Sequence, residues 1–166
     1  MGLKITGLEE YVRSLERVSD NAEEAEKRAV YKGAKIVADA IKAGLKTIPT
    51  AEGSIPGLPP YGTAANPINT ISRQQKADLI NGFGVAKIAE KGNSVDTHVG
   101  FDGYGSIKTK KHPGGLPNVL LARAITSGSS FRIKNPIIRT SVNKARAKAR
   151  EAMKKELERE IEKEMK

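Results

Sequence analysis

The chain has 166 residues, a net charge of +10 and 38% apolar residues, so it fits one domain with a modest aliphatic core. It has no cysteine, which excludes a disulfide framework, a thiolate zinc site and a cysteine nucleophile. No run of about 18 apolar residues is present, so the sequence predicts no membrane-spanning helix.

Apolar residues at helical spacing predict two helices near the N-terminus. The first covers residues 7–19 and places its apolar side chains on one face. The polar tripeptide Ser19–Asn21 interrupts it, and Asp20 with Glu23 forms a capping pair for a second helix over residues 21–46. The second helix carries a stripe of small residues that lets another helix approach closely. We therefore expect it to be the central packing helix.

Residues 47–70 form a long loop with five prolines, three glycines and no apolar period. A stretch of this length without periodicity is usually either functional or disordered. It contains more large apolar residues than a solvated linker does. We expect it to be mobile in the free protein and to become ordered against a partner, with Leu58 and Tyr61 as anchors.

The middle of the chain predicts a short helix followed by a pair of strands. The helix covers residues 72–81, and the strands cover approximately residues 83–89 and 94–101. Gly92 supplies the residue that a tight connecting turn requires. A second glycine-rich loop, which is also basic, follows at residues 102–115.

The last third of the chain predicts a short apolar helix over residues 116–125, an extended segment at 131–134 and a long helix that begins after Pro136. The final turns are almost all charged, which is typical of a solvated extension or of a helix that awaits a partner. We expect residues 1–155 to form a single domain and residues 156–166 to form a charged helical extension. The predicted fold is α+β: two N-terminal helices and a long C-terminal helix packed on a small, mainly antiparallel sheet.

Positive charge is concentrated in residues 108–155, which carry thirteen basic side chains and one acid, Glu151, for a net charge of +12. Residues 1–30 sum to −2. So basic a segment favours an acidic partner, either nucleic acid or an acidic protein surface, and a solvated helix face is the alternative. Aromatic residues that could stack on bases are scarce in it, which favours the protein surface.

No constellation of residues in the sequence indicates catalysis. The two histidines, His98 and His112, have no cysteine and no pair of carboxylates nearby that would complete a metal site. The glycines at residues 100–105 lack the spacing of a phosphate-binding loop. We expect no enzymatic activity, no cofactor and no metal ion.

Four stretches of the chain carry a family resemblance: Gly7-Leu8-Glu9-Glu10-Tyr11, Gly33-Ala34-Lys35-Ile36-Val37, Asp78-Leu79-Ile80-Asn81 and the run from Leu121 to Ser141. In the last run, an alanine-bearing helix ends near Gly128, and Asn135-Pro136-Ile137-Ile138-Arg139 opens the terminal helix. This order of elements resembles the small tail-completion, or head–tail joining, proteins of long-tailed bacteriophages.

The resemblance implies a structural, non-enzymatic protein of the virion neck or tail, which assembles in the host cytoplasm as a hexameric or other ring. Its implied partners are copies of itself, a portal-proximal connector and the tail tube or tail terminator protein. No association with a membrane is expected. The rival hypothesis is a sequence-nonspecific nucleic-acid-binding protein that uses residues 108–155.

Two sets of residues follow as candidates for the functional surface. The expected assembly interface consists of Leu58, Tyr61, Gly128, Pro136, Ile137 and Arg139. The expected electrostatic surface, which would meet an acidic protein or DNA, consists of Lys108, Lys110, Lys111, Arg132, Lys134, Arg146, Lys148 and Arg150.

Overall fold

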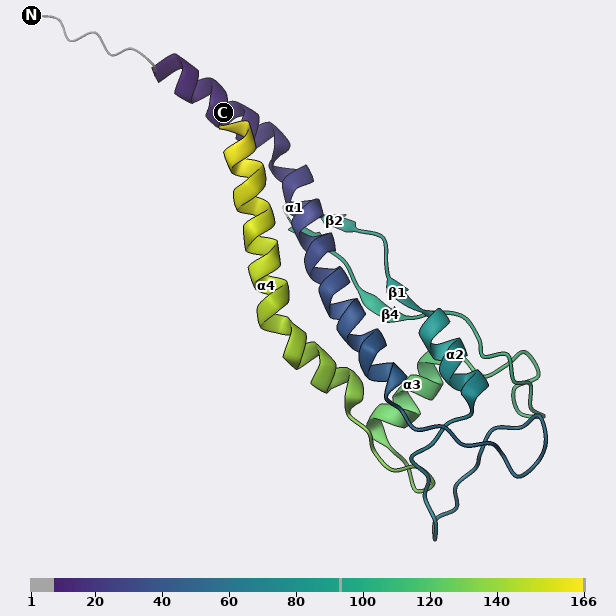
Figure 1. Ribbon diagram of the computed structural model, residues 1–166. Helices are drawn as coiled ribbons and strands as arrows, with labels where there is room; N and C mark the ends of the chain where they lie inside the picture. Colours follow the sequence, from purple (N-terminus) through teal and green to yellow (C-terminus); the bar gives the residue numbers. More distant parts are fainter. Residues whose placement is uncertain (1–7, 93, 166) are drawn as a thin grey trace, which may run out of the picture.

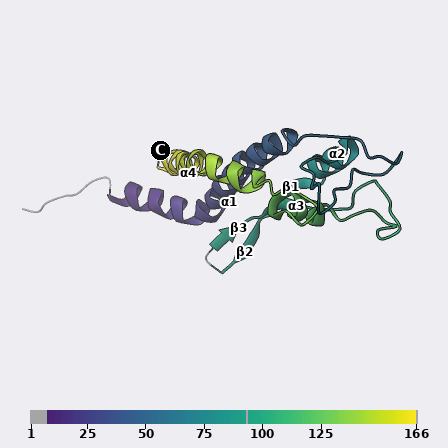
Figure 2. The same cartoon turned by 90° about the horizontal axis from the view of Figure 1, so that it is seen from below.

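The computed structural model describes residues 8–92 and 94–165 of the chain. Two long helices lie side by side and form an arm that projects from a smaller body (Figure 1). The body contains two short helices, a hairpin and two long loops, and it lies at one end of the arm (Figure 2). The fold is α+β, as predicted, and helices make up most of it, but the long C-terminal helix packs mainly on the N-terminal helix and not on the sheet as expected. In chain order the helices are α1 (Leu8–Lys46), α2 (Arg73–Asn81), α3 (Asn118–Ser127) and α4 (Ile137–Glu164).

The N-terminal helix α1 is continuous, so the prediction of two helices separated at Ser19–Asn21 is wrong. The side-chain amide of Asn21 donates to the carbonyl of Arg17, one turn earlier, at 3.0 Å. A polar side chain that bonds back onto its own helix neither caps nor ends it. Packing along α4 then stabilises the helix through this polar stretch. Gly7, where the first helix was expected to begin, lies outside the described residues.

The predicted strand pair is confirmed as an antiparallel hairpin, but each strand is divided in two. The outer half turns tightly at Gly92, whose φ is +58°. Between the two halves, the hydroxyl of Thr97 donates to the carbonyl of Ala86 at 2.8 Å and so takes an acceptor that a continuous ladder uses. The four strands are β1 (Phe83–Val85), which pairs with β4 (Val99–Phe101), and β2 (Ala89–Lys91), which pairs with β3 (Ser94–Asp96).

Local signals for the other helices are also confirmed. Helix α2 begins after Ser72, whose hydroxyl accepts from the backbone N–H of Gln75, while the Gln75 side chain accepts from the Ser72 N–H. Helix α3 lies two residues later than predicted and ends at Gly128, with φ +74°. Helix α4 begins directly after Pro136.

The apolar core lies where the arm meets the body. Its largest fully buried side chains come from the end of α1, from α2 and from the segment before it: Ile41, Leu45, Ile48, Ile71 and Leu79. The expected close approach of a second helix to α1 is observed. A Cβ atom at Gly44 would collide with the hydroxyl of Ser141 on α4, and one at Gly33 would lie 2.6 Å from the side chain of Met153. The small residues of α1 therefore face α4.

The loop at residues 47–70 is fastened to the body near both of its ends. Thr50 forms a bridge with Ile71, and Ile68 forms a parallel bridge with Arg132 in the extended segment after α3. The N–H of Ile133 donates to the carbonyl of Ile68 at 2.9 Å. Mobility of this loop in the free protein stays a prediction.

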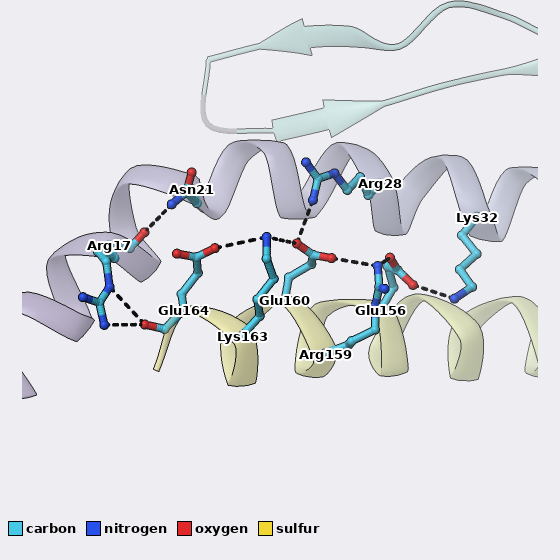
Figure 3. Close-up of polar contacts among 9 residues, drawn as sticks. All are labelled: Arg17, Asn21, Arg28, Lys32, Glu156, Arg159, Glu160, Lys163 and Glu164. Carbon is cyan, nitrogen blue, oxygen red and sulfur yellow. Dashed lines mark hydrogen bonds and ion pairs between the residues drawn. The ribbon is translucent and has the colours of Figure 1, made fainter. Parts of the chain in front are cut away.

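The charged end of α4 packs on the stretch of α1 from Arg17 to Lys32. Glu156 and Glu160 are only 6% and 7% exposed, because they lie between the two helices (Figure 3). Lys32 donates to Glu156 at 2.5 Å, Arg28 donates to Glu160 at 2.7 Å, and Arg159 donates to both carboxylates. We call this set of ion pairs the carboxylate ladder. The charged C-terminal turns were expected to be either a solvated extension or a helix that awaits a partner. They form a helix with a partner, and that partner is α1 of the same chain.

The end of α4 and the hairpin are each fixed to α1 by a basic side chain. Arg17 donates from two of its nitrogens to the carbonyl of Glu164 at 3.2 and 3.1 Å, and so satisfies an orphan acceptor at the end of α4. Lys27 lies 2.6 Å from Glu23 on α1 and 2.7 Å from Glu90 on strand β2. Hydrogen bonds to Glu23 and Glu90, and then to Glu24, raise the pKa of Lys27.

The carboxylate ladder predicts a specific dependence of stability on pH. Glu156 accepts hydrogen bonds from Lys32 and Arg159. These bonds lower the pKa of Glu156, and the bond from Lys32 has the larger effect. A carboxyl whose pKa falls on folding adds stability above its unfolded pKa of about 4.3, and that stability is lost as the pH falls through the folded value. We expect Glu156→Gln to lower the melting temperature at pH 7, and the difference from the unchanged protein to shrink as the pH falls below about 4.

Glu158→Gln is the matched control, because Glu158 is on the same helix but its side chain is 54% exposed. Thermal unfolding followed by circular dichroism at several pH values checks both variants. A deficit for Glu156→Gln that stays constant from pH 7 to pH 3 would contradict the assignment.

Candidate assembly surfaces

A cleft of about 880 Å³ opens between the two glycine-rich loops of the body. One wall is the Pro-rich segment Leu58–Tyr61, and the facing wall is the basic loop from Ile107 to Pro113. Side chains from α2 and α3, among them Leu121, line the remainder. We refer to it as the basic cleft.

Asp78 on α2 holds the basic wall of this cleft in place. One of its carboxylate oxygens accepts from the backbone N–H of Ser106, and the other accepts from the Ser106 hydroxyl, both at 2.7 Å. The side chain of Gln74 donates to the same carboxylate at 3.0 Å. The loop is closed behind this point by the N–H of Gly105, which donates to the carbonyl of Leu116 at 2.8 Å. The wall is therefore anchored to a helix at its base and exposed at its tip.

The electrostatic character of the basic cleft is strongly positive. Lys108, Lys110 and Lys111 are exposed, and no ion pair joins them to another residue in the described part of the chain. Arg132 is half-buried and donates to the carbonyl of Thr70 at 2.8 Å, and burial lowers its pKa from the ordinary value. An arginine stays protonated at neutral pH in spite of such a shift. Four cations therefore face an apolar lining.

The structure divides the expected assembly interface. Leu58 and Tyr61 both line the basic cleft, and Tyr61 is 64% exposed. The other four residues lie elsewhere: Gly128 ends α3, Pro136 precedes α4, Ile137 packs against the core, and Arg139 is exposed in the first turn of α4.

The expected electrostatic surface is divided in the same way. Lys108, Lys110, Lys111 and Arg132 come together at the cleft, which also contains Leu58 and Tyr61. The remaining four are exposed but do not line it: Lys134 is the last residue of the extended segment, and Arg146, Lys148 and Arg150 lie along α4. The cleft thus brings together half of the residues of the expected electrostatic surface and a third of those of the expected assembly interface.

A second surface, at the opposite end of the molecule, was not identified from the sequence. Helix α1 has 39 residues and α4 has 28, so the first turns of α1 extend past the end of α4 (Figure 1). Tyr11, Val12 and Leu15 lie in these turns and are 53%, 44% and 45% exposed. Their spacing in the sequence predicts that they share one apolar face of a helix. Because α4 is shorter than α1, it cannot cover the first turns of α1, and this difference in length is the signal that could have identified these residues as exposed.

Acidic side chains accompany these uncovered apolar residues. Glu16, Asp20 and Glu26 are exposed, and no ion pair joins them to any residue within 8–92 or 94–165. We refer to residues 10–20 of α1 as the overhang, because α4 does not continue alongside most of them (Figure 1). The overhang is apolar and has a small excess of acidic side chains, Glu10, Glu16 and Asp20 against Arg13 and Arg17, whereas the cleft is apolar and basic.

Within residues 8–92 and 94–165, no group of three or more His, Asp or Glu side chains gathers in an arrangement that could hold a metal ion. No helix in that part of the chain has the length and apolar character needed to cross a membrane.

Comparisons with protein-family models, with curated proteins and with solved structures give no match for this chain. The function is therefore inferred from the chain's own surfaces and from the order of its elements.

The anchoring role of Asp78 leads to a test of how the cleft is built. Asp78→Ala removes the acceptor for three hydrogen bonds, and we expect the basic loop to open more often. A loss of about 1.4 kcal/mol in local stability raises the open population about tenfold. Trypsin cleavage after Lys108, Lys110 and Lys111 should accelerate by this factor. Asp39→Ala, at an exposed ion pair on α1, is the control and should leave the rate unchanged.

Proposed function

We propose that this chain is a structural virion protein of a tailed bacteriophage, which acts in head–tail joining or tail completion as a ring-forming component of the neck. The order of elements that resembles this family supports the proposal. One continuous N-terminal helix takes the place of the two helices that the resemblance implies. A short helix, a hairpin, a short helix ended by glycine and a terminal helix opened by Pro136 then follow in the same order. The family is structural, and we propose no catalytic role for this chain.

The observation that carries the proposal is a surface that is left incomplete at two separate places. Large apolar side chains are exposed on the overhang, and others are exposed near the cleft, among them Tyr61, Phe131 and Ile133. Clusters of this kind on a small domain mark surfaces that a partner covers. Because each buried Å² of apolar surface contributes about 25 cal/mol, covering them favours association. Two different surfaces on one chain favour head-to-tail contacts, which form a ring when the rotation between copies closes.

The chemistry of the cleft lends no support to an enzyme. The carboxylate and the imidazole in its lining belong to Asp78 and His112, and both carboxylate oxygens of Asp78 are engaged by its own loop and helix. General acid–base catalysis needs a group within hydrogen-bonding reach of a substrate proton. An anchored carboxylate serves structure better than catalysis.

The proposal predicts a defect in joining when the gene is deleted from the phage. Electron microscopy of lysates should show DNA-filled heads and complete tails that remain separate, and plaque formation should fall by several orders of magnitude. Supplying the unchanged protein from a plasmid should restore joined particles. Mass spectrometry of purified virions should also detect the protein. Fully joined, infectious particles that lack the protein would rule out a neck role.

A second candidate function, nonspecific DNA binding, is favoured by the unpaired lysines of the basic loop. If the four cations of the cleft contact four phosphates, affinity should fall on the order of a hundredfold between 50 and 200 mM salt, without sequence preference. Because stacking aromatics are scarce, we expect such binding to be weak. Filter binding across a salt series checks this. Tight binding that survives 200 mM salt would favour the DNA-binding function over the structural one.

A further inference from the structure

We propose that the basic cleft of one copy of this chain receives the overhang of α1 from a second copy, so that copies join head to tail. This contact deepens the proposed function, because it is the one by which the ring is built. That the copies close into a ring rests on the proposed function. The ligand of the cleft is thus an amphipathic, acidic helix of the same protein.

The overhang has the form of a helix that docks into a groove. Tyr11 and Leu15 are one turn apart and lie on the same face, with Val12 beside them. All three are about half exposed, although side chains of this type are usually buried. Helices that bind in grooves use apolar anchors at this spacing.

The basic cleft has the corresponding shape and lining. Its volume of about 880 Å³ is within the range of roughly 300–1,000 Å³ that is typical of binding pockets, and it can hold several side chains. Leu58, Ile107, Leu116 and Leu121 give it apolar walls. Its proline-rich wall is restricted before binding, so that less conformational entropy is lost when a helix docks.

Charge determines which helix the cleft accepts and in which orientation. Glu16 and Asp20 on the overhang and Lys110 and Lys111 on the cleft have no ion-pair partner in the described part of their own chain. Opposite charges on docking surfaces accelerate encounter and exclude wrong partners. Glu16 lies at the edge of the apolar face and carries most of this attraction. Asp20 lies further round the helix, on the same side as Arg13 seven residues earlier, so these two charges partly offset each other.

The overhang cannot reach the cleft of its own chain. Helix α1 is continuous over 39 residues, roughly 58 Å, and the overhang and the body lie at opposite ends of it (Figure 1). An overhang that occupies the cleft must therefore come from another copy of the chain. Because the two surfaces are different, each copy offers one of each, and the contact repeats from copy to copy.

Charge reversal on each surface gives a test that separates this contact from any other. The cleft variant is Lys110→Glu/Lys111→Glu, and the overhang variant is Glu16→Lys/Asp20→Lys. We expect each variant alone to self-associate at least tenfold more weakly than the unchanged protein, by sedimentation velocity. An equal mixture of the two should recover association, because each acidic surface then meets a basic one.

The matched control is Lys144→Glu/Lys148→Glu, two exposed lysines on α4 that do not line the cleft. It should self-associate like the unchanged protein. Circular dichroism melts of all variants establish that each is folded. Association that is unaffected by both reversals, or that the mixture fails to restore, overturns the inference.

Cross-linking gives an independent readout, because the chain has no cysteine of its own. We expect Ser19→Cys and Thr109→Cys in one chain to yield a ladder of covalent oligomers with a short bis-maleimide. Ser19→Cys with Ala147→Cys, an exposed position on α4, should not yield this ladder.

Failure here is distinguishable from failure of the proposed function. Oligomers that form without cross-links between positions 19 and 109 overturn this contact and leave a neck role intact. An unchanged protein that stays monomeric at its highest soluble concentration also overturns this contact. Joined virions without the protein overturn the neck role and leave the contact standing as a property of the chain.

Discussion

The rest of the structure depends on the burial of two carboxylates, Glu156 and Glu160, between α1 and α4. Charged groups removed from water are costly unless each is paired and hydrogen-bonded. Here Lys32 and Arg28 of α1 and Arg159 of α4 provide the partners. Pairs of this kind add little net stability compared with an apolar interface, but a shift of one helix turn would leave buried charges alone. They therefore fix the register of α4 along α1.

This register connects the arm to both candidate surfaces. It determines that α4 ends beside Arg17, and so it determines that Tyr11 and Leu15 extend beyond it. At the other end, close contact of Gly44 with Ser141 brings the start of α4 to the core. The body then carries the cleft at a fixed distance from the overhang. The proposed head-to-tail contact therefore joins two surfaces whose separation within each copy is fixed.

The sequence predicted those parts of the fold that local chemistry determines. The start of α2 at Ser72, the turn at Gly92, the end of α3 at Gly128 and the start of α4 after Pro136 all depend on residues within a few positions of one another. The break at Ser19–Asn21 was predicted from equally local signals and is wrong. Contact with a helix more than a hundred residues away outweighs a weak local preference.

The candidate site was predicted only in part, for the same reason. Leu58 and Lys110 were both singled out, but nothing in their local sequence shows that two loops some fifty residues apart enclose one cleft. Alternating glutamates and lysines near the C-terminus are typical of a solvated helix. Only the cations of α1, far away in the chain, make Glu156 an internal residue.

The contact of Lys27 with Glu90 has a mechanical consequence. Strands β1, β3 and β4 all lie against α1, so the hairpin braces the arm from the body to a point partway along it (Figure 2). The ion pair of Lys27 with Glu90 adds to this brace. Dissolved salt screens the ion pair but leaves the packing of the strands in place, so the brace holds at high ionic strength.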